Sequence, residues 1–385
     1  MSHFIHLNPR ARDWVYQSEP SSGAATDKSA ILAFHKTIPD YNETRLHSLP
    51  DLAAELGLGH VLLKDESNRF GLPAFKILGA SWAVYRAVGA HLELPAVESG
   101  GIPFAEVGAN AKEAGVQIVT LTEGNCGRAV ARMATRHMGI PTRVYVPTYM
   151  DEATRAKIRS EGAEVIPANG SYDDVIPVAL KEAQARENSI MVLDVGVEGC
   201  EEVPRYFVQG YGSMLAESDR QVLDLTGGKS ATHAIVPVGA GSIGEAVTAH
   251  FKSSSRKNKS GTATVLGVEP TTAACLFQSL EAGKSVPVPT EDTIMCGMNC
   301  GTLSTTAWPV LRDGVDAGVM VTDIEAHNAV EDLKARNILA GPCGAATLAA
   351  LRRACKDAKQ KLRLDGTSIV VLYCTEGQRE YSIPT

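Results

Sequence analysis

The 385-residue sequence has no apolar run that approaches the length of a membrane span. It also lacks a basic stripe, and its formal net charge of -7 argues against a nucleic-acid partner. The eight cysteines form no C-x-x-C pair, and no His or Cys cluster completes a zinc site around the closest two, Cys296 and Cys300. The first residues, MSHFIHLNPRARDW, have no apolar signal-peptide core. We therefore expect a cytoplasmic protein with reduced thiols and without a metal, a membrane or a nucleic-acid partner.

Short apolar runs alternate with amphipathic runs from about residue 49 onward, which predicts an α/β protein with parallel sheets. We expect the first forty residues to form an arm or surface loop, and the basic run KSSSRKNKS to be a solvated loop. The polar segment at 220–233 is predicted to cross between domains. The predicted strands are HVLLKDE, QIVTLTEGN, TRVYVP, EVIPANG, HAIVPV and TSIVVLYC, and the predicted helices are ILGASWAVYRAVGA, GRAVARMATRHMG, DEATRAKIRSEG and SYDDVIPVALKEAQAREN.

A glycine-rich loop follows the apolar run HAIVPV. Its residues, 239–244, read GAGSIG and match G-x-G-x-x-G. A helical run follows, and a second apolar run ends at Glu269, near the spacing expected of a ribose-binding acid. The motif alone favours a nicotinamide-dependent dehydrogenase. The same loop also suits a phosphate monoester, because glycines admit close approach and a helix N-terminus favours an anion.

Three further stretches are not explained by dinucleotide binding. Lys76 stands between Phe75 and Ile77 where a Gly/Pro-containing loop meets a helical run, a position that suits a depressed pKa or a Schiff base. The turn GNCG joins a strand to a helix, where backbone N–H groups can bind a carboxylate. Cys374 and Thr375 end the last strand, at the edge of a parallel sheet where ligands bind.

In this order, the segments resemble the fold type II, tryptophan-synthase-β-like family of pyridoxal 5′-phosphate (PLP) enzymes, and within it the diaminopropionate ammonia-lyases. The resemblance begins near residue 47 and rests on RFGLPAFKILGA, EGNCGR, the YDD of SYDDV, EEVPRYFVQGYGSM and GMNCGTLSTTAWPVL. It implies two open, mostly parallel twisted sheets flanked by helices. Residues 1–84 and 216–385 would form a large PLP-binding domain, and residues 85–215 a smaller, mobile α/β domain. Glu269 then becomes an ordinary strand-end acid.

The resemblance also implies roles for individual residues. Lys76 would hold PLP covalently and exchange protons, and Glu123 and Asp194 would be the two acids that serve proton transfer. Asn125 would contact the ring hydroxyl of PLP, and its turn, with Gly124, Cys126 and Gly127, would lie near the substrate carboxylate. The phosphate would be held by Gly239, Ala240, Gly241, Ser242 and Ile243. Cys374 or Thr375 would face the pyridine nitrogen, where a neutral group makes the ring a weaker electron sink than a carboxylate does.

The implied reaction is α,β-elimination from 2,3-diaminopropionate to pyruvate and ammonia. The sequence departs from the family where the substrate should bind. Glu123 stands where Asp is expected, Cys126 replaces the usual histidine of GNHG, VGVEGC follows Asp194, and GPCG carries Pro342 and Cys343 where Glu and Ser are usual. A larger or less polar β-substituted amino acid would fit these changes, so cofactor binding is the firmer expectation.

Alternatives follow from the departures. One is another PLP-dependent β-eliminase or β-replacement enzyme, biosynthetic or similar to the serine and threonine dehydratases. A second is a PLP-fold protein that only binds or regulates, and a third is the NAD-dependent dehydrogenase. Enzymes of this fold are commonly homodimers, so we expect a homodimer that acts on a small amino acid.

Overall fold

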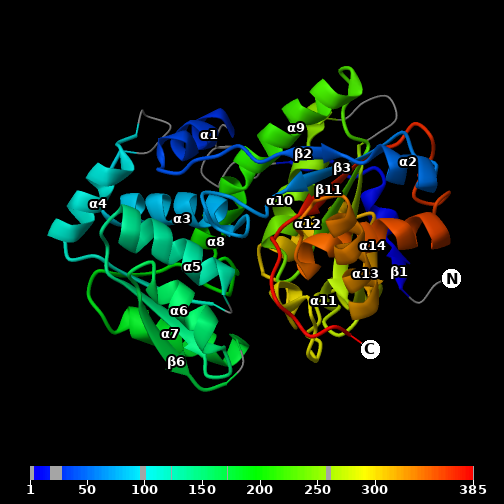
Figure 1. Cartoon of the computed structure of the whole chain (residues 1–385). Coiled ribbons are helices and arrows are strands. Elements are labelled where there is room, and N and C mark those ends of the chain that lie inside the picture. The colour runs from blue at the N-terminus through cyan, green and yellow to red at the C-terminus, as the bar shows by residue number, and fades with distance from the viewer. Residues whose placement is uncertain are drawn as a thin grey trace. The chain divides into compact units, whose positions relative to one another are not determined.

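The computed structural model describes residues 4–17, 28–95, 101–122, 124–170, 172–256 and 262–384 (Figure 1). The chain divides into two compact units. The first unit comprises Met1–Ala25, Asn42–Phe75 and Met214–Thr385, and the second comprises Thr26–Tyr41 and Lys76–Ser213. The division predicted from the sequence at 84/85 falls within one helix of the second unit, and as functional domains the predicted segments stay a prediction.

A seven-stranded sheet in the order β1-β10-β9-β8-β11-β3-β2 forms the centre of the first unit. The five inner strands are parallel, and the two edge strands pair antiparallel to their neighbours. Every residue of β8, β9 and β11 is buried, as expected of parallel strands covered on both faces. The strands are β1 (Ile5–Leu7), β2 (Leu46–Ser48), β3 (His60–Asp65), β8 (His233–Pro237), β9 (Thr264–Pro270), β10 (Ala317–Val321) and β11 (Ile369–Cys374).

Helices cover both faces of this sheet. On one face, Ile235 and Leu372 join an apolar core with Leu348 of α14, and α13 packs on α14. On the other face, the ring of Tyr373 in β11 meets Phe251 of α10. The helices are η1 (Pro9–Ala11), α2 (Pro50–Leu56), α9 (Gly212–Thr226), α10 (Ser242–Phe251), η4 (Ser254–Arg256), α11 (Cys275–Ala282), η5 (Cys296–Met298), α12 (Ala307–Gly314), α13 (Asp323–Ala335) and α14 (Pro342–Asp357), of which α9 begins with the last two residues of the second unit.

The second unit contains a parallel sheet of four strands in the order β6-β5-β4-β7. Its long helix α3 packs against α1, α5 and α8. The strands are β4 (Gln117–Leu121), β5 (Thr142–Pro147), β6 (Glu164–Ala168) and β7 (Ser189–Met191). The helices are α1 (Lys28–Thr37), α3 (Lys76–His91), α4 (Phe104–Glu113), α5 (Asn125–Ala131), the π-helix η3 (Arg132–His137), α6 (Glu152–Arg159), α7 (Tyr172–Gln184) and α8 (Glu202–Gly210).

Two glycines let α3 and α8 approach closely. A Cβ atom on Gly79 would lie 2.7 Å from Cε1 of Tyr211, and one on Gly210 would lie 2.4 Å from the carbonyl oxygen of Leu78. Larger residues do not fit at these contacts without a shift of the backbone or of a buried ring. The sequence QGYG therefore seats α8 and the following tyrosine against the helix that begins with Lys76.

The predicted fold class, parallel sheets flanked by helices, is confirmed. Three expectations about individual segments are wrong. The segment at 220–233 does not cross between units, because α9 continues to Thr226 with Val222 buried and the crossing lies at 213/214. Within the first forty residues, β1 pairs with β10 and α1 buries Ile31. Lys252 is fully buried and pairs with Asp316 at 2.8 Å, so it is not part of a solvated loop; residues 257–260 of the same run lie outside the described residues.

Within the part of the chain that the structure describes, no helix is long and apolar enough to cross a membrane. Nor do three or more His, Cys, Asp or Glu side chains gather there in a group that could hold a metal ion.

Candidate active site

Three neighbouring strands of the first unit end at the same edge of the sheet. The order β8-β11-β3 places them side by side, all parallel, with Cys374 in register with Asp65. The strand order also reverses here, because β9 and β10 follow β8 on one side while β3 lies on the other. Ligands of open α/β sheets bind at the carboxyl edge where the order reverses. The three segments that leave these strands are therefore the first candidates for a site.

The segment that leaves β8 is the glycine-rich loop, which turns directly into α10. Gly241 is the N-cap of α10 and has φ +109°, a conformation that favours glycine. A Cβ atom there would lie 2.8 Å from Cβ of Ala307, and one on Gly239 would lie 3.1 Å from the carbonyl oxygen of Gly297. The loop is further held by the hydrogen bond from the Ser304 amide to the Ala240 carbonyl, 2.8 Å long.

This loop fits a phosphate monoester. No side chain caps the N-terminus of α10, so its first N–H groups, near Ser242 and Ile243, are not satisfied by a capping group of the helix itself. The helix dipole adds partial positive charge at the same place. Both Gly239 and Gly241 leave no room for a side chain toward the neighbouring segments. Backbone N–H donors at a helix N-terminus and a closely packed glycine backbone are the features that a bound phosphate needs.

The segment that leaves β11 presents a thiol and a hydroxyl. Cys374 is fully buried, and its Sγ lies 3.5 Å from the carbonyl oxygen of Glu376. Burial raises the pKa of the Cys374 thiol well above its usual value, and the nearby acid Asp65 adds to the rise. The thiol is therefore neutral near pH 7. Thr375 is also buried, and its carbonyl accepts a hydrogen bond from the Phe75 amide at 3.3 Å.

The segment that leaves β3 leads to Lys76. The Glu66 amide donates to the Cys374 carbonyl at 2.9 Å, and the Gly377 amide donates to Pro73 at 2.9 Å. With the bond between Phe75 and Thr375, these contacts join both ends of the segment 66–75 to the end of β11. Lys76 is the next residue in the chain. The first unit thus fixes the backbone up to Phe75, the residue before the lysine.

Within the second unit, Lys76 lies beside an acid and a thiol. Nζ of Lys76 forms an ion pair with Oδ2 of Asp194, which is buried in the loop after β7. Burial of the Lys76 amine lowers its pKa, but the interactions with Asp194, Tyr211 and Cys126 together outweigh burial, so the pKa of Lys76 is raised. Burial and then the charge of Asp194 raise the pKa of the neighbouring Cys126 thiol. The expected depression of the lysine pKa is therefore wrong for the free amine, because it has a carboxylate partner.

The GNCG turn is stabilised by the threonine that precedes it. Oγ1 of Thr122 accepts hydrogen bonds from the amides of Gly124 at 2.9 Å and Gly127 at 3.0 Å. Gly124 has φ +149°, and a Cβ atom on Gly127 would lie 2.4 Å from Cγ2 of Thr122. Asn125 begins α5 and is exposed, while Cys126 is buried. Glu123 lies outside the described residues.

The structure thus places the predicted residues in two groups. The first unit holds 239–243 with Cys374 and Thr375, and the second unit brings Lys76, Cys126 and Asp194 together. Two further residues were not identified from the sequence. Tyr211 interacts electrostatically with Lys76, and it belongs to the QGYG string that carried part of the resemblance. Oε1 of Glu376 accepts a hydrogen bond from the Cys343 amide at 3.0 Å. Its position directly after Thr375 is the sequence feature that could have identified it.

Comparison with known proteins gives consistent matches over almost the whole chain. Residues 38–375 match the family described as pyridoxal-phosphate dependent enzyme. The diaminopropionate ammonia-lyase of Salmonella typhimurium is 32% identical over 363 residues, which cover 90% of this chain and 88% of the relative. The diaminopropionate ammonia-lyase of Escherichia coli is 29% identical over 361 residues, covering 90% of this chain and 87% of the relative.

Solved structures give the same result. The chain superimposes on the Escherichia coli diaminopropionate ammonia-lyase in complex with an aminoacrylate-PLP azomethine intermediate with a TM-score of 0.84, at 26% identity, over 97% of this chain and 93% of the other. It superimposes on maize serine racemase with a TM-score of 0.71 at 22% identity, over 92% of this chain and 94% of the other. The second match concerns the fold alone.

Proposed function

The chain belongs to the pyridoxal-phosphate-dependent enzymes, as a member similar to the diaminopropionate ammonia-lyases, and from this premise we propose that it converts 2,3-diaminopropionate to pyruvate and ammonia. One observation carries the proposal. The phosphate-fitting loop, the neutral thiol of Cys374 and the segment that ends at Lys76 all leave neighbouring parallel strands at one edge of one sheet. This arrangement provides a place for each end of PLP and a lysine to hold it.

PLP, when bound, supplies an electron sink that lets the bonds at the α- and β-carbons of an amino acid break. Lys76 would hold the cofactor through Nζ and would accept or return the proton at the α-carbon of the substrate. Residues 239–243 would hold the phosphate, Asn125 would contact the ring hydroxyl, and Cys374 or Thr375 would be the group near the pyridine nitrogen. Because the Cys374 thiol is neutral, it would not stabilise a protonated pyridine nitrogen as a carboxylate does, and the ring would be a weaker electron sink.

The leaving group is an amine and needs a proton as it departs. Asp194, already paired with Lys76, is one acid that supports this transfer, and Glu123 is proposed as the other. The turn at Gly124, Cys126 and Gly127 would orient the substrate carboxylate. Two acids that act from different positions would also allow both α-epimers to react.

A second candidate is elimination or β-replacement on another β-substituted amino acid. It is favoured by the thiols at Cys126 and Cys343, both buried and both with a pKa raised first by burial. Neutral thiols bind a second ammonium group less well than polar or charged side chains do. Product analysis with serine, threonine and diaminopropionate separates the two candidates.

The test is visible absorption of the purified protein, before and after addition of L- and D-2,3-diaminopropionate, with pyruvate assayed in the same samples. An absorption band that is lost in Lys76→Ala, together with pyruvate from diaminopropionate, would support both cofactor and reaction. A band without pyruvate would retain the cofactor and move the proposal to another substrate. Absence of a band after added PLP would refute it.

We also propose that the protein is a cytoplasmic homodimer. None of the eight cysteines forms a disulfide, which suits a reducing compartment. Light scattering of the purified protein measures the mass directly, and a monomer at micromolar concentration would contradict the dimer.

A further inference from the structure

A network of buried charges lies directly before the lysine segment in the first unit. We call Thr44, Lys64, Glu66, Arg69 and Glu217 the Arg69 node. The side chains of Lys64, Glu66 and Arg69 are fully buried, and those of Thr44 and Glu217 are nearly so. The node holds two cations and two carboxylates, so its formal charge is balanced. None of these residues was assigned a role by the sequence.

The guanidinium of Arg69 connects all parts of the node. Its Nε donates to Glu66 at 2.8 Å, and Nη2 donates to Glu66 at 2.7 Å, to Glu217 at 2.7 Å and to Oγ1 of Thr44 at 2.9 Å. Nη1 donates to Glu217 at 2.9 Å and to the carbonyl of Asn42 at 2.7 Å. The planar fork of arginine suits such paired carboxylates, and lysine cannot reproduce it.

Lys64, in β3, also binds two of these residues, Thr44 and Glu217. Its Nζ donates to the Thr44 carbonyl at 2.8 Å and to Oε2 of Glu217 at 2.9 Å. Burial lowers the pKa of Lys64, while the charges of Glu66 and Glu217 oppose that fall. Burial by itself would raise the pKa of Glu217, but Arg69 and Lys64 hold it below its usual value. The charges therefore depend on one another.

The node joins three of the four places at which the chain passes from one unit to the other. These three passages lie at Tyr41/Asn42, Phe75/Lys76 and Ser213/Met214, and the fourth, between residues 25 and 26, lies outside the described residues. Asn42 and Thr44 follow the first passage, and Arg69 precedes the second. Glu217 follows the third passage, near the start of α9. Each of the three segments contributes a hydrogen-bonding group to Arg69.

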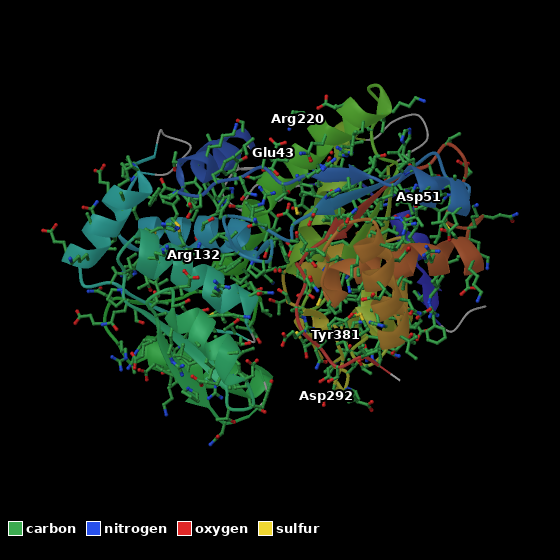
Figure 2. The ribbon with its side chains drawn as sticks, in the orientation of Figure 1. Glu43, Asp51, Arg132, Arg220, Asp292 and Tyr381 are labelled. Atoms are coloured by element: carbon green, nitrogen blue, oxygen red, sulfur yellow. The ribbon has the colours of Figure 1, made fainter. Side chains whose placement is uncertain are left out.

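Exposed side chains at the surface also connect the segment at 42–44 to α9. Figure 2 shows Glu43 and Arg220 close to each other, and their side chains form an ion pair. The side chain of Gln221 donates to Glu43 at 2.7 Å and to the Thr44 carbonyl at 2.8 Å. The segment at 42–44 is thus tied to α9 both inside and at the surface.

Arg69 also shapes the loop that ends at Lys76. Its backbone exchanges two hydrogen bonds with Leu72, at 2.8 and 2.9 Å. The next amide, that of Phe70, donates to Oδ1 of Asn42 at 2.7 Å, and Phe70 has φ +53°, which is unfavourable for a bulky residue. The loop holds this conformation because its neighbours on both sides are fixed.

Buried ion pairs add little stability compared with apolar packing of the same volume, but loss of one partner leaves an uncompensated charge. A balanced node at three chain passages is therefore better explained by positioning than by stability. We propose that Arg69 is a positioning residue for Lys76: its hydrogen bonds hold the loop at 66–75 against the segments that follow the other two passages, at 42–44 and at the start of α9. The inference rests on the proposed function only in taking Lys76 as the cofactor lysine.

The test compares Arg69→Met with Lys252→Met as the matched control. Lys252 is also a fully buried cation of the first unit, and its Nζ pairs with Asp316 at 2.8 Å and donates to the Ala11 carbonyl at 3.0 Å. These contacts involve none of the three passages. Glu217→Gln, which keeps the shape and one acceptor oxygen, serves as the milder variant if Arg69→Met does not fold.

The first readout is amide hydrogen exchange of the protein freed of PLP. We expect Arg69→Met, or Glu217→Gln, to lose protection together at 42–44, 66–75 and 214–221, whereas Lys252→Met loses it around 252, 262 and 316. Protection retained at 66–75 in a folded variant would overturn the inference. This readout needs no cofactor, so it stands even if the protein proves not to bind PLP.

The second readout is titration with PLP, followed by its absorption. The Kd of the Arg69 variant is expected to rise by about tenfold or more, because the uncompensated carboxylates displace the loop that carries Lys76. The Lys252 control should remain within about threefold of the parent. If the wild type binds PLP and the Arg69 and Lys252 variants have equal Kd values, the link between Arg69 and Lys76 would be overturned. If the wild type does not bind PLP, the proposed function would be refuted instead.

Discussion

Lys76 and Asp194 form an ion pair within the second unit, although they are 118 residues apart in the chain. Lys76 begins α3, and Asp194 follows β7. Burial disfavours the charged amine, but the neighbouring groups, of which the Asp194 carboxylate acts most strongly, together outweigh burial and raise the pKa of Lys76. An amine must be neutral to attack an aldehyde such as that of PLP. The pair therefore keeps the free lysine protonated until the cofactor arrives.

Replacing Asp194 by Asn should lower the pKa of Lys76, because it removes the strongest of the interactions that oppose the effect of burial on the amine. A larger neutral fraction at pH 7 should make PLP attach faster in the variant than in the wild type, while elimination slows because the acid is lost. The measurement is the rate of appearance of the bound-cofactor band as a function of pH.

Asp151→Asn is the matched control for this experiment. Asp151 is an acid of the same unit whose side chain accepts the Thr154 amide at 2.8 Å as the N-cap of α6. It should leave the pH profile of attachment unchanged. Identical profiles for wild type and Asp194→Asn would show that Asp194 does not control the protonation of the lysine.

Gly241→Ala should weaken phosphate binding. The new methyl group would lie 2.8 Å from Cβ of Ala307 and 3.0 Å from Cδ1 of Leu311, at φ +109°. Strain and overpacking of this kind cost about 1–3 kcal/mol each, and the loop must shift to relieve them. The affinity for PLP should fall, while the weaker affinity for pyridoxal, which has no phosphate, should change little. An equal loss for both compounds would argue against a phosphate site at this loop.

Gly79→Ala and Gly89→Ala lie in the same helix, α3, and should act in opposite directions. The first would place a methyl group 2.7 Å from the Tyr211 ring and 2.8 Å from the Phe207 ring, and overpacking costs about 1–3 kcal/mol. The second meets nothing within 4 Å and should stabilise the helix by about 0.5–1 kcal/mol. Urea unfolding of both variants checks the signs, and a neutral Gly79→Ala would contradict the close packing of α3 and α8.

The sequence predicted what depends on local pattern. Apolar runs identified β3, β5 and α3, and the glycine-rich loop lies, as expected, between a strand and the N-terminus of a helix. The environment of Lys76 was predicted with the wrong sign, since its pKa depends on Asp194, far away in the chain. The polar run KSSSRKNKS predicts a solvated loop around Lys252, but its partner Asp316 lies just before β10, far along the chain. Pairing across the fold is not encoded in the neighbours of a residue.

Glu269 is an ordinary strand-end acid by its place in the sequence, but the structure buries it fully within β9. Its carboxylate oxygens accept the amides of Leu276 at 2.7 Å and Phe277 at 2.8 Å, in the first turn of α11. Burial raises the pKa of Glu269 to about 8, although the two amide hydrogen bonds favour the charged form.

The folded protein therefore keeps a proton on Glu269 over a pH range in which the unfolded chain, with a usual pKa of 4.5, has lost it. Through this group alone, the free energy of unfolding should fall by about 1.4 kcal/mol per pH unit between roughly pH 5 and pH 8, and level off above. Glu269→Gln lacks this slope, so its stability relative to the wild type should improve steadily over that range, as measured by urea unfolding. Glu325→Gln is the control: Glu325 caps α13, its pKa is lowered, and the cost of the change should be constant from pH 5 to pH 8. Parallel pH curves for wild type and Glu269→Gln would mean that the buried carboxyl is already charged at pH 5, held by the amides of α11.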